Sequence, residues 1–369
     1  MAPIEDQIRA VEEEIHKTPY NKATQHHIGK LKAKLARLKE EALKRAAKGK
    51  GGGPGYAVRK SGNATVGLVG FPSTGKSTLL NAITSAQSEV AAYDFTTLDV
   101  IPGLLEYRGA KIQVLDMPGL IRGASKGRGR GREVISVARI CDLLLVMVDV
   151  FETNVHVLKD ELEQSGIRLN VRPPDVVIKK RTRGGVSVNS TIPLTKVLEE
   201  TVADMVREFG HLSADVVVRQ DVSADELVDV LAGNRVYMPA FVVLNKIDLV
   251  GADYLREVEK RLTGWRVVAI SAEKREGLDR LKEEIYRSLK FIRVYLKPQG
   301  KEADLKEPLI VKEASTIGMV CDALHRDFRA KFRYANVWGR SATHPGQRVG
   351  LEHVLVDEDV LTIVVRRST

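Results

Sequence analysis

The sequence predicts an α/β protein in which a mostly parallel β-sheet carries helices on both faces. A helical hairpin is expected before this domain and a small mixed β domain after it. Between residues 64 and 289, short apolar runs alternate with amphipathic helical patterns, which is typical of parallel sheets with crossover helices. The 369 residues are 43% hydrophobic and 29% charged, the composition of a globular chain long enough for two or three domains.

Residues 1–60 are predicted to form a helical hairpin and a linker. Apolar residues recur at helical spacing from Ile4 to Ile15 and from Ile28 to Leu38. Residues 48–55 are mostly glycine and suit a flexible linker. The second helix either contacts RNA phosphates or presents a solvated basic face, and the sequence leaves both interpretations open. Its basic residues are Lys30, Lys32, Lys34, Arg37, Lys39, Lys44 and Arg45.

The central domain is predicted over residues 61–290. One interval, from Asp149 to Ala240, is too long for a single crossover helix at 155–164, so residues 166–237 are expected to be an inserted α/β subdomain. Its basic run, 179–185, is predicted to be an exposed hairpin tip. The predicted strands are 64–69, 111–116, 143–149, 240–245 and 267–271, and the closing helix is 278–289.

The last domain is predicted over residues 291–369. Strands are expected at 291–296, 309–311, 335–339 and 360–365, with one helix at 317–328. About 75 residues of this pattern suit a small mixed β domain.

Residues 70–77 fit the phosphate-loop pattern G-x-x-x-x-G-K-[ST] and lie between a predicted strand and a predicted helix. Backbone N–H groups and the helix N-terminus stabilise a polyphosphate in this arrangement. Lys76 is expected to reach the β- and γ-phosphates, and the Ser77 hydroxyl is expected to bind Mg²⁺. The predicted nucleotide contacts of this segment are Gly70, Phe71, Pro72, Ser73, Thr74, Gly75, Lys76, Ser77 and Thr78.

Two further segments are expected to meet the metal and the γ-phosphate. Asp116-Met-Pro-Gly119 ends a predicted strand, so the Asp116 carboxylate would bind Mg²⁺ through water while the Gly119 N–H approaches the γ-phosphate. A switch loop also needs a threonine that senses Mg²⁺ and the γ-phosphate. We choose Thr97 over its neighbour Thr96 for this role, with ordinary loop threonines as the alternative.

The run Asn245-Lys-Ile-Asp248 predicts selection of guanine. An aspartate at this spacing can accept hydrogen bonds from N1 and N2 of guanine, and adenine lacks that pair of donors. Lys246 is expected to pack along the base and Asn245 to tie loops together. Ser271 and Ala272 end another predicted strand and are placed for a backbone contact to guanine O6. GTP and GDP are therefore the predicted ligands.

Leu120 follows Gly119 at the position where Ras-like GTPases carry a glutamine that orients water. Leucine cannot form a hydrogen bond to water, so intrinsic hydrolysis is expected to be slow, on the order of 10⁻⁴–10⁻³ s⁻¹ or below. Nearby, Arg128, Arg130 and Arg132 stand among glycines. These arginines either approach phosphate or RNA, or they simply belong to the second switch loop, and the second interpretation is preferred for any one of them.

Charge and cysteine usage set the expected environment. Lys and Arg total 58 against 48 Asp and Glu, a net charge of +10, which favours a polyanionic partner such as RNA. Cys141 and Cys321 lie far apart without metal-ligand spacing, which is typical of a reducing, cytoplasmic setting. There is no secretory segment at the N-terminus and no apolar run long enough to span a bilayer, so no membrane partner is expected.

Together these motifs resemble the Obg branch of translation-factor GTPases and, more specifically, the developmentally regulated GTP-binding (DRG) proteins. The resemblance rests on residues 70–77, Phe95-Thr-Thr-Leu98, 116–120, the Gly/Arg run to Arg132, 21–24, 31–35, 233–237 and the C-terminal domain. It implies a P-loop GTPase domain with an inserted subdomain and a C-terminal β-grasp (TGS) domain. It also implies ribosome association and, in eukaryotic members, a stabilising partner protein. K⁺ activation often accompanies an asparagine in the phosphate loop, and Ser73 does not support it.

Two functions follow from these predictions. The first is a Mg²⁺-dependent GTPase that acts on ribosomes or translation. The alternative is an RNA- or ribosome-binding scaffold in which GTP is a structural or switch ligand and hydrolysis is incidental. A role in tRNA modification has no separate catalytic motif to support it.

Overall fold

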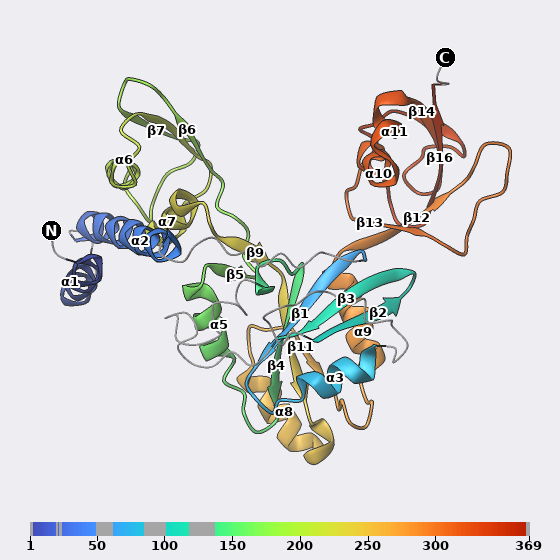
Figure 1. Cartoon of the computed structure of the whole chain (residues 1–369), viewed down its shortest axis with the longest axis horizontal. Coiled ribbons are helices and arrows are strands. Elements are labelled where there is room, and N and C mark those ends of the chain that lie inside the picture. The colour runs from blue at the N-terminus through green and yellow to red at the C-terminus, as the bar shows by residue number, and fades with distance from the viewer. Residues whose placement is uncertain are drawn as a thin grey trace. The chain divides into compact units, whose positions relative to one another are not determined.

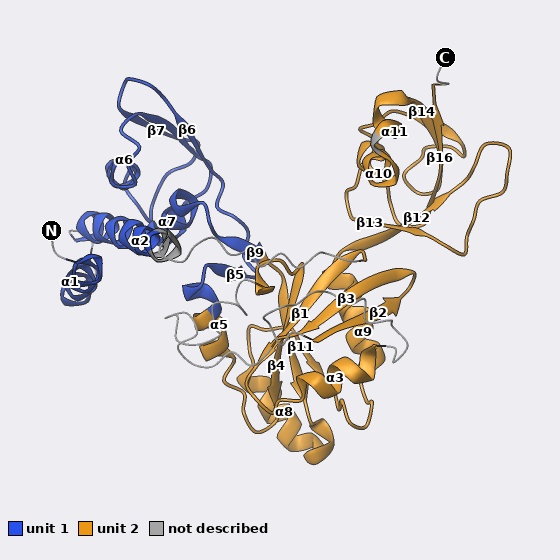
Figure 2. Ribbon diagram, viewed as in Figure 1, with its two compact units in different colours: residues 1–57, 162–237 blue, residues 58–161, 238–369 orange. Residues whose placement is uncertain are grey.

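The structure is a computed structural model, and it describes residues 3–19, 21, 24–48, 62–84, 101–117 and 137–366. The chain divides into two compact units, one of Met1–Ala57 with Leu162–Tyr237 and one of Val58–Glu161 with Met238–Thr369 (Figure 2). No helix within the described ranges is both long and apolar enough to cross a membrane.

The second unit contains a six-stranded sheet in the order β11-β10-β4-β1-β3-β2 (Figure 1). All neighbouring strands run parallel except β2 and β3. Every residue of β1, β4 and β10 is buried, because helices cover both faces of a parallel sheet. The strands are β1 (Ala64–Gly70), β2 (Ile101–Tyr107), β3 (Ala110–Asp116), β4 (Leu143–Asp149), β10 (Ala240–Asn245) and β11 (Val267–Ala269).

Helices α3 and α9 pack on one side of this sheet, and α5 and α8 lie on the other (Figure 1). Leu79 of α3 and Leu281 of α9 share one buried cluster with Leu68 of β1. The helices of this unit are α3 (Lys76–Ile83), α5 (Val155–Gln164, which continues into the other unit), α8 (Ala252–Arg261), α9 (Leu278–Ser288) and the short 3₁₀ helix η2 (Ile247–Leu249). The fold class predicted from the sequence, a P-loop α/β domain, is confirmed.

Strand β2 was not predicted from the sequence. It is an edge strand, half exposed, and it contains Pro102 and Gly103, so it lacks the apolar run of a buried strand. A tight turn at Arg108 and Gly109, with φ of 49° and 82°, joins it to β3. Both central residues have positive φ, the conformation that a two-residue hairpin turn requires.

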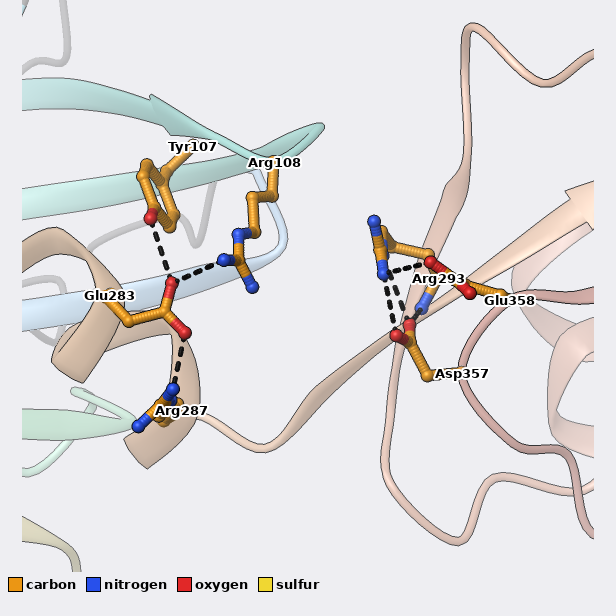
Figure 3. Close-up of polar contacts among 7 residues, drawn as sticks. All are labelled: Tyr107, Arg108, Glu283, Arg287, Arg293, Asp357 and Glu358. Atoms are coloured by element: carbon orange, nitrogen blue, oxygen red, sulfur yellow. Dashed lines mark hydrogen bonds and ion pairs between the residues drawn. The ribbon is translucent and has the colours of Figure 1, made fainter.

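The tip of this hairpin contacts α9 beside the start of the C-terminal domain (Figure 3). Glu283 accepts hydrogen bonds from Tyr107 Oη and Arg287 Nε, both at 2.9 Å, and Arg108 lies 2.9 Å from the same carboxylate. The contacts of Tyr107 and Arg108 with Glu283 hold the hairpin against α9.

The C-terminal domain is a five-stranded sheet in the order β13-β12-β16-β14-β15, with parallel central strands β12 and β16. Arg293 fixes the start of this domain through Asp357 at 2.7 Å and Glu358 at 2.8 Å (Figure 3). The strands are β12 (Phe291–Leu296), β13 (Leu309–Lys312), β14 (Phe332–Trp338), β15 (Gln347–Val349) and β16 (Asp359–Val365).

The single helix expected at 317–328 is wrong, because the structure has two: α10 (Ile317–Leu324) and α11 (Arg326–Lys331). His325 separates them with an extended backbone, and its ring Nδ1 accepts the Asp327 N–H as the N-cap of α11. The following strand also starts earlier than expected, at Phe332. Helix α10 covers one face of the sheet, where Ile317, Val320 and Cys321 are buried.

The first unit combines the N-terminal helices α1 (Ile4–Lys17) and α2 (Gln25–Lys48) with the inserted segment. Val11, Leu31 and Leu38 form the apolar seam between the two helices. The insertion contributes β5 (Ile167–Leu169), β6 (Val176–Lys180), β7 (Val186–Ser190), α6 (Glu199–Glu208), β8 (Ala214–Val218), α7 (Ala224–Ala232) and β9 (Val236–Met238).

Residues 179–185 are not the tip of a hairpin. The sheet order is β6-β8-β7, so β8 separates the two strands that this loop connects. The loop is exposed, as expected. The strand pairing depends on β8, which begins 29 residues after the loop ends, so the local sequence pattern does not reveal it.

The cations of α2 have a role that neither sequence interpretation included. Ala33 of α2 is fully buried in the core of the insertion, and lysines and arginines beside it pair with carboxylates of α1, α6 and α7. These pairs are Lys30 with Asp204 at 3.0 Å, Lys32 with Asp225 at 2.7 Å, Arg37 with Glu208 at 3.3 Å and Lys39 with Glu12 at 2.7 Å.

Asp229 of α7 should be a strong stabiliser of the first unit. Its carboxylate is 7% exposed and accepts from Arg168 Nε at 2.6 Å and from Arg235 Nε at 2.7 Å. Asp229→Ala leaves two guanidinium groups without their counterion, so we expect the free energy of unfolding to fall by about 3 kcal/mol. Urea titration measures the change.

The matched control is Asp253→Ala, which removes a 96% exposed carboxylate from its pair with Arg256. A loss below about 0.5 kcal/mol is expected there. Equal losses in the two variants would contradict the role assigned to Asp229.

Candidate nucleotide site

The phosphate loop lies between β1 and α3 and requires glycine at two positions. At Gly70 an added Cβ would lie 2.5 Å from the Met147 carbonyl oxygen. At Gly75, where φ is 90°, it would lie 2.3 Å from Asn245 Nδ2. The loop therefore runs too close to β4 and β10 for any side chain at these positions.

The remaining side chains of the loop fall into a buried and an exposed set. Thr74 is buried and donates from Oγ1 to the Phe71 carbonyl oxygen at 3.0 Å. Pro72, Ser73 and Thr78 are exposed, and Ser73 has a positive φ of 63°.

Lys76 begins α3 and turns its amine back into the loop. Its Nζ donates to the carbonyl oxygens of Gly70 at 3.2 Å and Phe71 at 2.8 Å. Burial lowers the pKa of Lys76, while the negative charge of Asp116 acts in the opposite direction. The amine thus lies where anionic phosphate oxygens would favour its charged form.

Ser77 and Asp116 bring two oxygen ligands together. The Ser77 hydroxyl donates to Asp116 Oδ2 at 2.5 Å. Asp116 Oδ1 is buried and has no hydrogen-bond partner among the described residues. A buried carboxylate oxygen without a partner is costly, and a hard divalent cation such as Mg²⁺ prefers such oxygen ligands. These two residues therefore fit a magnesium site.

Asn245 links the phosphate loop to the loop after β11. Its Nδ2 donates to the Thr74 carbonyl oxygen at 2.9 Å, and its Oδ1 accepts the Ala272 N–H at 3.0 Å. The amide of Ala272 is engaged by Asn245 in this structure, so its contact with guanine O6 stays a prediction. Ser271, fully buried, accepts the Lys274 N–H and holds the same loop.

Lys246 and Asp248 follow Asn245 with different surroundings. Lys246 has a positive φ of 65° and donates from Nζ to Asp149 Oδ2 at 2.7 Å. Burial raises the pKa of Asp149, but the hydrogen bonds from Lys246 and from the N–H groups of Glu152 and Phe151 outweigh it and keep the pKa low. Asp149 is a member of the site that the sequence analysis missed, although its place at the end of a buried strand was a usable signal.

The Asp248 carboxylate is half-buried and makes no hydrogen bond or ion pair with any residue that the structure describes. Both of its oxygens are therefore available to a ligand. Four residues with expected or alternative roles, Thr96, Thr97, Gly119 and Leu120, lie outside the described residues, as do Arg128, Arg130 and Arg132.

Comparison with known families agrees with this geometry. The family described as "50S ribosome-binding GTPase" matches residues 65–180, and the C-terminal region of the same domain (MMR_HSR1) matches 183–291. The TGS domain matches residues 292–365. Fold, loops and family matches define a P-loop GTPase with a C-terminal TGS domain.

Similar proteins extend over nearly the whole chain. An uncharacterized GTP-binding protein of Methanocaldococcus jannaschii is 56% identical over 99% of this chain and 93% of its own length. Developmentally-regulated G-protein 3 of Arabidopsis thaliana is 46% identical over 99% of both chains. Developmentally-regulated GTP-binding protein 1 of Xenopus laevis is 44% identical over 97% of this chain and 98% of its own. The chain belongs to the DRG family of GTPases.

Asn245→Ala tests the link between the two loops. The change removes both hydrogen bonds and leaves the Thr74 carbonyl and the Ala272 N–H without this partner, so unfolding should become easier by about 2 kcal/mol. Affinity for GDP, measured by titration of a fluorescent analogue, should fall at least tenfold. The control is Asn189→Ala, at an exposed position of β7, which should change neither stability nor GDP affinity. GDP affinity equal to wild type in the Asn245 variant would contradict the role of Asn245 as the link between the loops.

Proposed function

We propose that this chain binds guanine nucleotides with Mg²⁺ and hydrolyses GTP to GDP and phosphate at the loop edge of the central sheet. The observation that carries the proposal is the Asp248 carboxylate, which has no partner among the described residues and follows Asn245, whose side chain is fixed by two hydrogen bonds. N1–H and N2–H of guanine form a donor pair that matches two carboxylate oxygens. Adenine would leave the carboxylate without these bonds, and this difference selects GTP.

Ser77 and Asp116 would hold the magnesium ion, and the position of the Lys76 amine supports contact with the β- and γ-phosphates. Bound Mg²⁺ would neutralise part of the charge on the phosphate oxygens. On the sequence alone, Thr97 would add a ligand to the metal and Gly119 a backbone N–H to the γ-phosphate. The other proposed contacts are the backbone of Gly70 to Thr78, the Lys246 stem along the base, and the Ser271–Ala272 turn.

Hydrolysis would proceed by in-line attack of water on the γ-phosphate, with positioning and electrostatic stabilisation supplying most of the rate. Leu120 cannot orient the water. We therefore propose slow turnover by the isolated chain and faster turnover when a partner completes the site.

The partner that we propose is the ribosome, in the cytoplasm. Three observations support it: residues 65–180 match the 50S ribosome-binding GTPase family, residues 292–365 match the TGS domain, and the net charge is +10. The scaffold alternative rests on Leu120 and on the basic flanking segments. A protein without a water-orienting side chain could use GTP only to set its shape.

Asp248→Asn should move nucleotide preference from GTP to XTP. The asparagine amide can donate to the C2 carbonyl of xanthine but cannot accept both guanine donors, so GTP affinity should fall by roughly a hundredfold. Competition titration against a fluorescent GDP analogue measures both affinities. Asp253→Asn is the control, because that carboxylate is exposed on the neighbouring helix α8; an unchanged GTP preference in the Asp248 variant contradicts the assignment.

If the chain is a ribosome-associated GTPase, ribosomes should stimulate its GTP turnover at least tenfold. Phosphate release is measured with and without purified ribosomes, and ribosome co-sedimentation is measured with GDP and with a non-hydrolysable GTP analogue. Lys76→Ala serves as the catalytically inactive control. Nucleotide-dependent binding without stimulation would instead favour the scaffold, and absence of both would reject the ribosomal role.

A further inference from the structure

The C-terminal sheet has one covered face and one open face. Helix α10 packs on the first, where Val294, Ala335, Val337 and Leu361 are buried. Because side chains alternate along a strand, the intervening residues point the other way. We call this second side the outer sheet face and define it by Tyr295, Lys297, Tyr334, Asn336, Trp338, Arg348, Val360 and Thr362.

Strand register places these residues side by side. Asn336 is paired with Thr362 of β16 on one side and with Arg348 of β15 on the other. Trp338 and Tyr295 both lie opposite Val360. The outer sheet face therefore presents three aromatic rings, one on β12 and two on β14, with β16 between these strands.

Cations lie directly on two of these rings. Lys297 Nζ is 4.7 Å from the centre of the Trp338 ring, and Arg348 Cζ is 3.9 Å from the centre of the Tyr334 ring. Among the described residues, the side-chain partners of these two cations are the rings and not carboxylates. They are thus unlike the cations of α2, which are largely neutralised.

A hollow of about 470 Å³ adjoins Trp338. Lys297, Lys301, Asn336 and Thr362 contribute to its lining, together with one carboxylate, Glu302. The Asn336 amide has no hydrogen-bond partner in the described part of the chain, so it can bind the polar edge of a ligand that enters the hollow.

We infer that the outer sheet face binds single-stranded RNA, with bases stacked on Trp338 and Tyr334 and phosphates at Lys297 and Arg348. A base stacked on an aromatic ring is held more strongly than an exposed cation over the same ring. An incoming base can therefore displace the cation, which then binds the adjacent phosphate. The Asn336 amide lies between the two rings, where it would reach the edge of a stacked base.

Other anionic partners use only part of this surface. An acidic peptide would engage the cations and leave the rings unused, and an RNA duplex keeps its base faces stacked inside the helix. The inference rests on the proposed ribosomal function for the source of the RNA, but the binding surface itself is argued from the residues above.

The test is binding of a fluorescently labelled twelve-nucleotide oligouridylate to the full chain, measured by anisotropy. Trp338→Ala should weaken binding by roughly ten- to a hundredfold, whereas Trp338→Phe should retain it within about threefold. Lys297→Gln should reduce the slope of log affinity against log salt by about 0.7. Affinity for GDP should be unchanged in all three, because the nucleotide site lies on the six-stranded sheet and not on this one.

A second readout reports stacking directly. The chain has two tryptophans, so Trp265→Phe leaves Trp338 as the single reporter, and RNA should quench its fluorescence. Binding without quenching, equal binding of duplex RNA, or full competition by poly-glutamate would overturn the inference. None of these measurements uses ribosomes or GTP turnover. A failure of the RNA-binding inference can therefore be distinguished from a failure of the proposed function.

Discussion

Parallel hydrogen bonding between β1 and its neighbours is the constraint on which the nucleotide site depends. Leu68 is level with Asp116 of β3, Gly70 is level with Met147 of β4, and Asp149 is level with Asn245 of β10. Because all four strands point the same way, their carboxyl ends meet at one edge and deliver the phosphate loop, the carboxylate for the metal and the base-selecting loop together. Asn245 then holds two of these loops at hydrogen-bond distance.

The positively charged side chains have different partners in different parts of the fold. Along α2 they are matched by carboxylates of α1, α6 and α7, so they contribute to cohesion of the first unit. On the outer sheet face, Lys297 and Arg348 rest on aromatic rings instead. Net charge alone therefore cannot locate a polyanion site, and the local partners of each cation decide which charges are available.

Much of the fold could be predicted from the sequence because the buried strands of a parallel sheet are apolar throughout, as β1, β4 and β10 are. The motif residues could be placed because each follows such a strand. Strand β2 was missed because an edge strand with Pro102 and Gly103 carries no such pattern. The break between α10 and α11 depends on the extended backbone of His325 alone. The strand order β6-β8-β7 depends on a segment remote in sequence, and so do the ion-pair partners of Lys30 and Lys32. Asp149 could have been recognised, since it ends β4 as Asp116 ends β3.

The seating of α2 on the insertion also determines when the first unit can be completed during synthesis. Ala33 and Gly29 of α2 lie against α6, where Thr201 Cγ2 comes within 2.8 Å of a Cβ placed at Gly29. Helix α2 ends at Lys48 and α6 begins at Glu199, so roughly 150 residues are made between them, which takes about 8–30 s at ordinary elongation rates. For that interval the nascent N-terminal hairpin has only its Val11–Leu31–Leu38 seam, and the apolar side of α2 is accessible to chaperones.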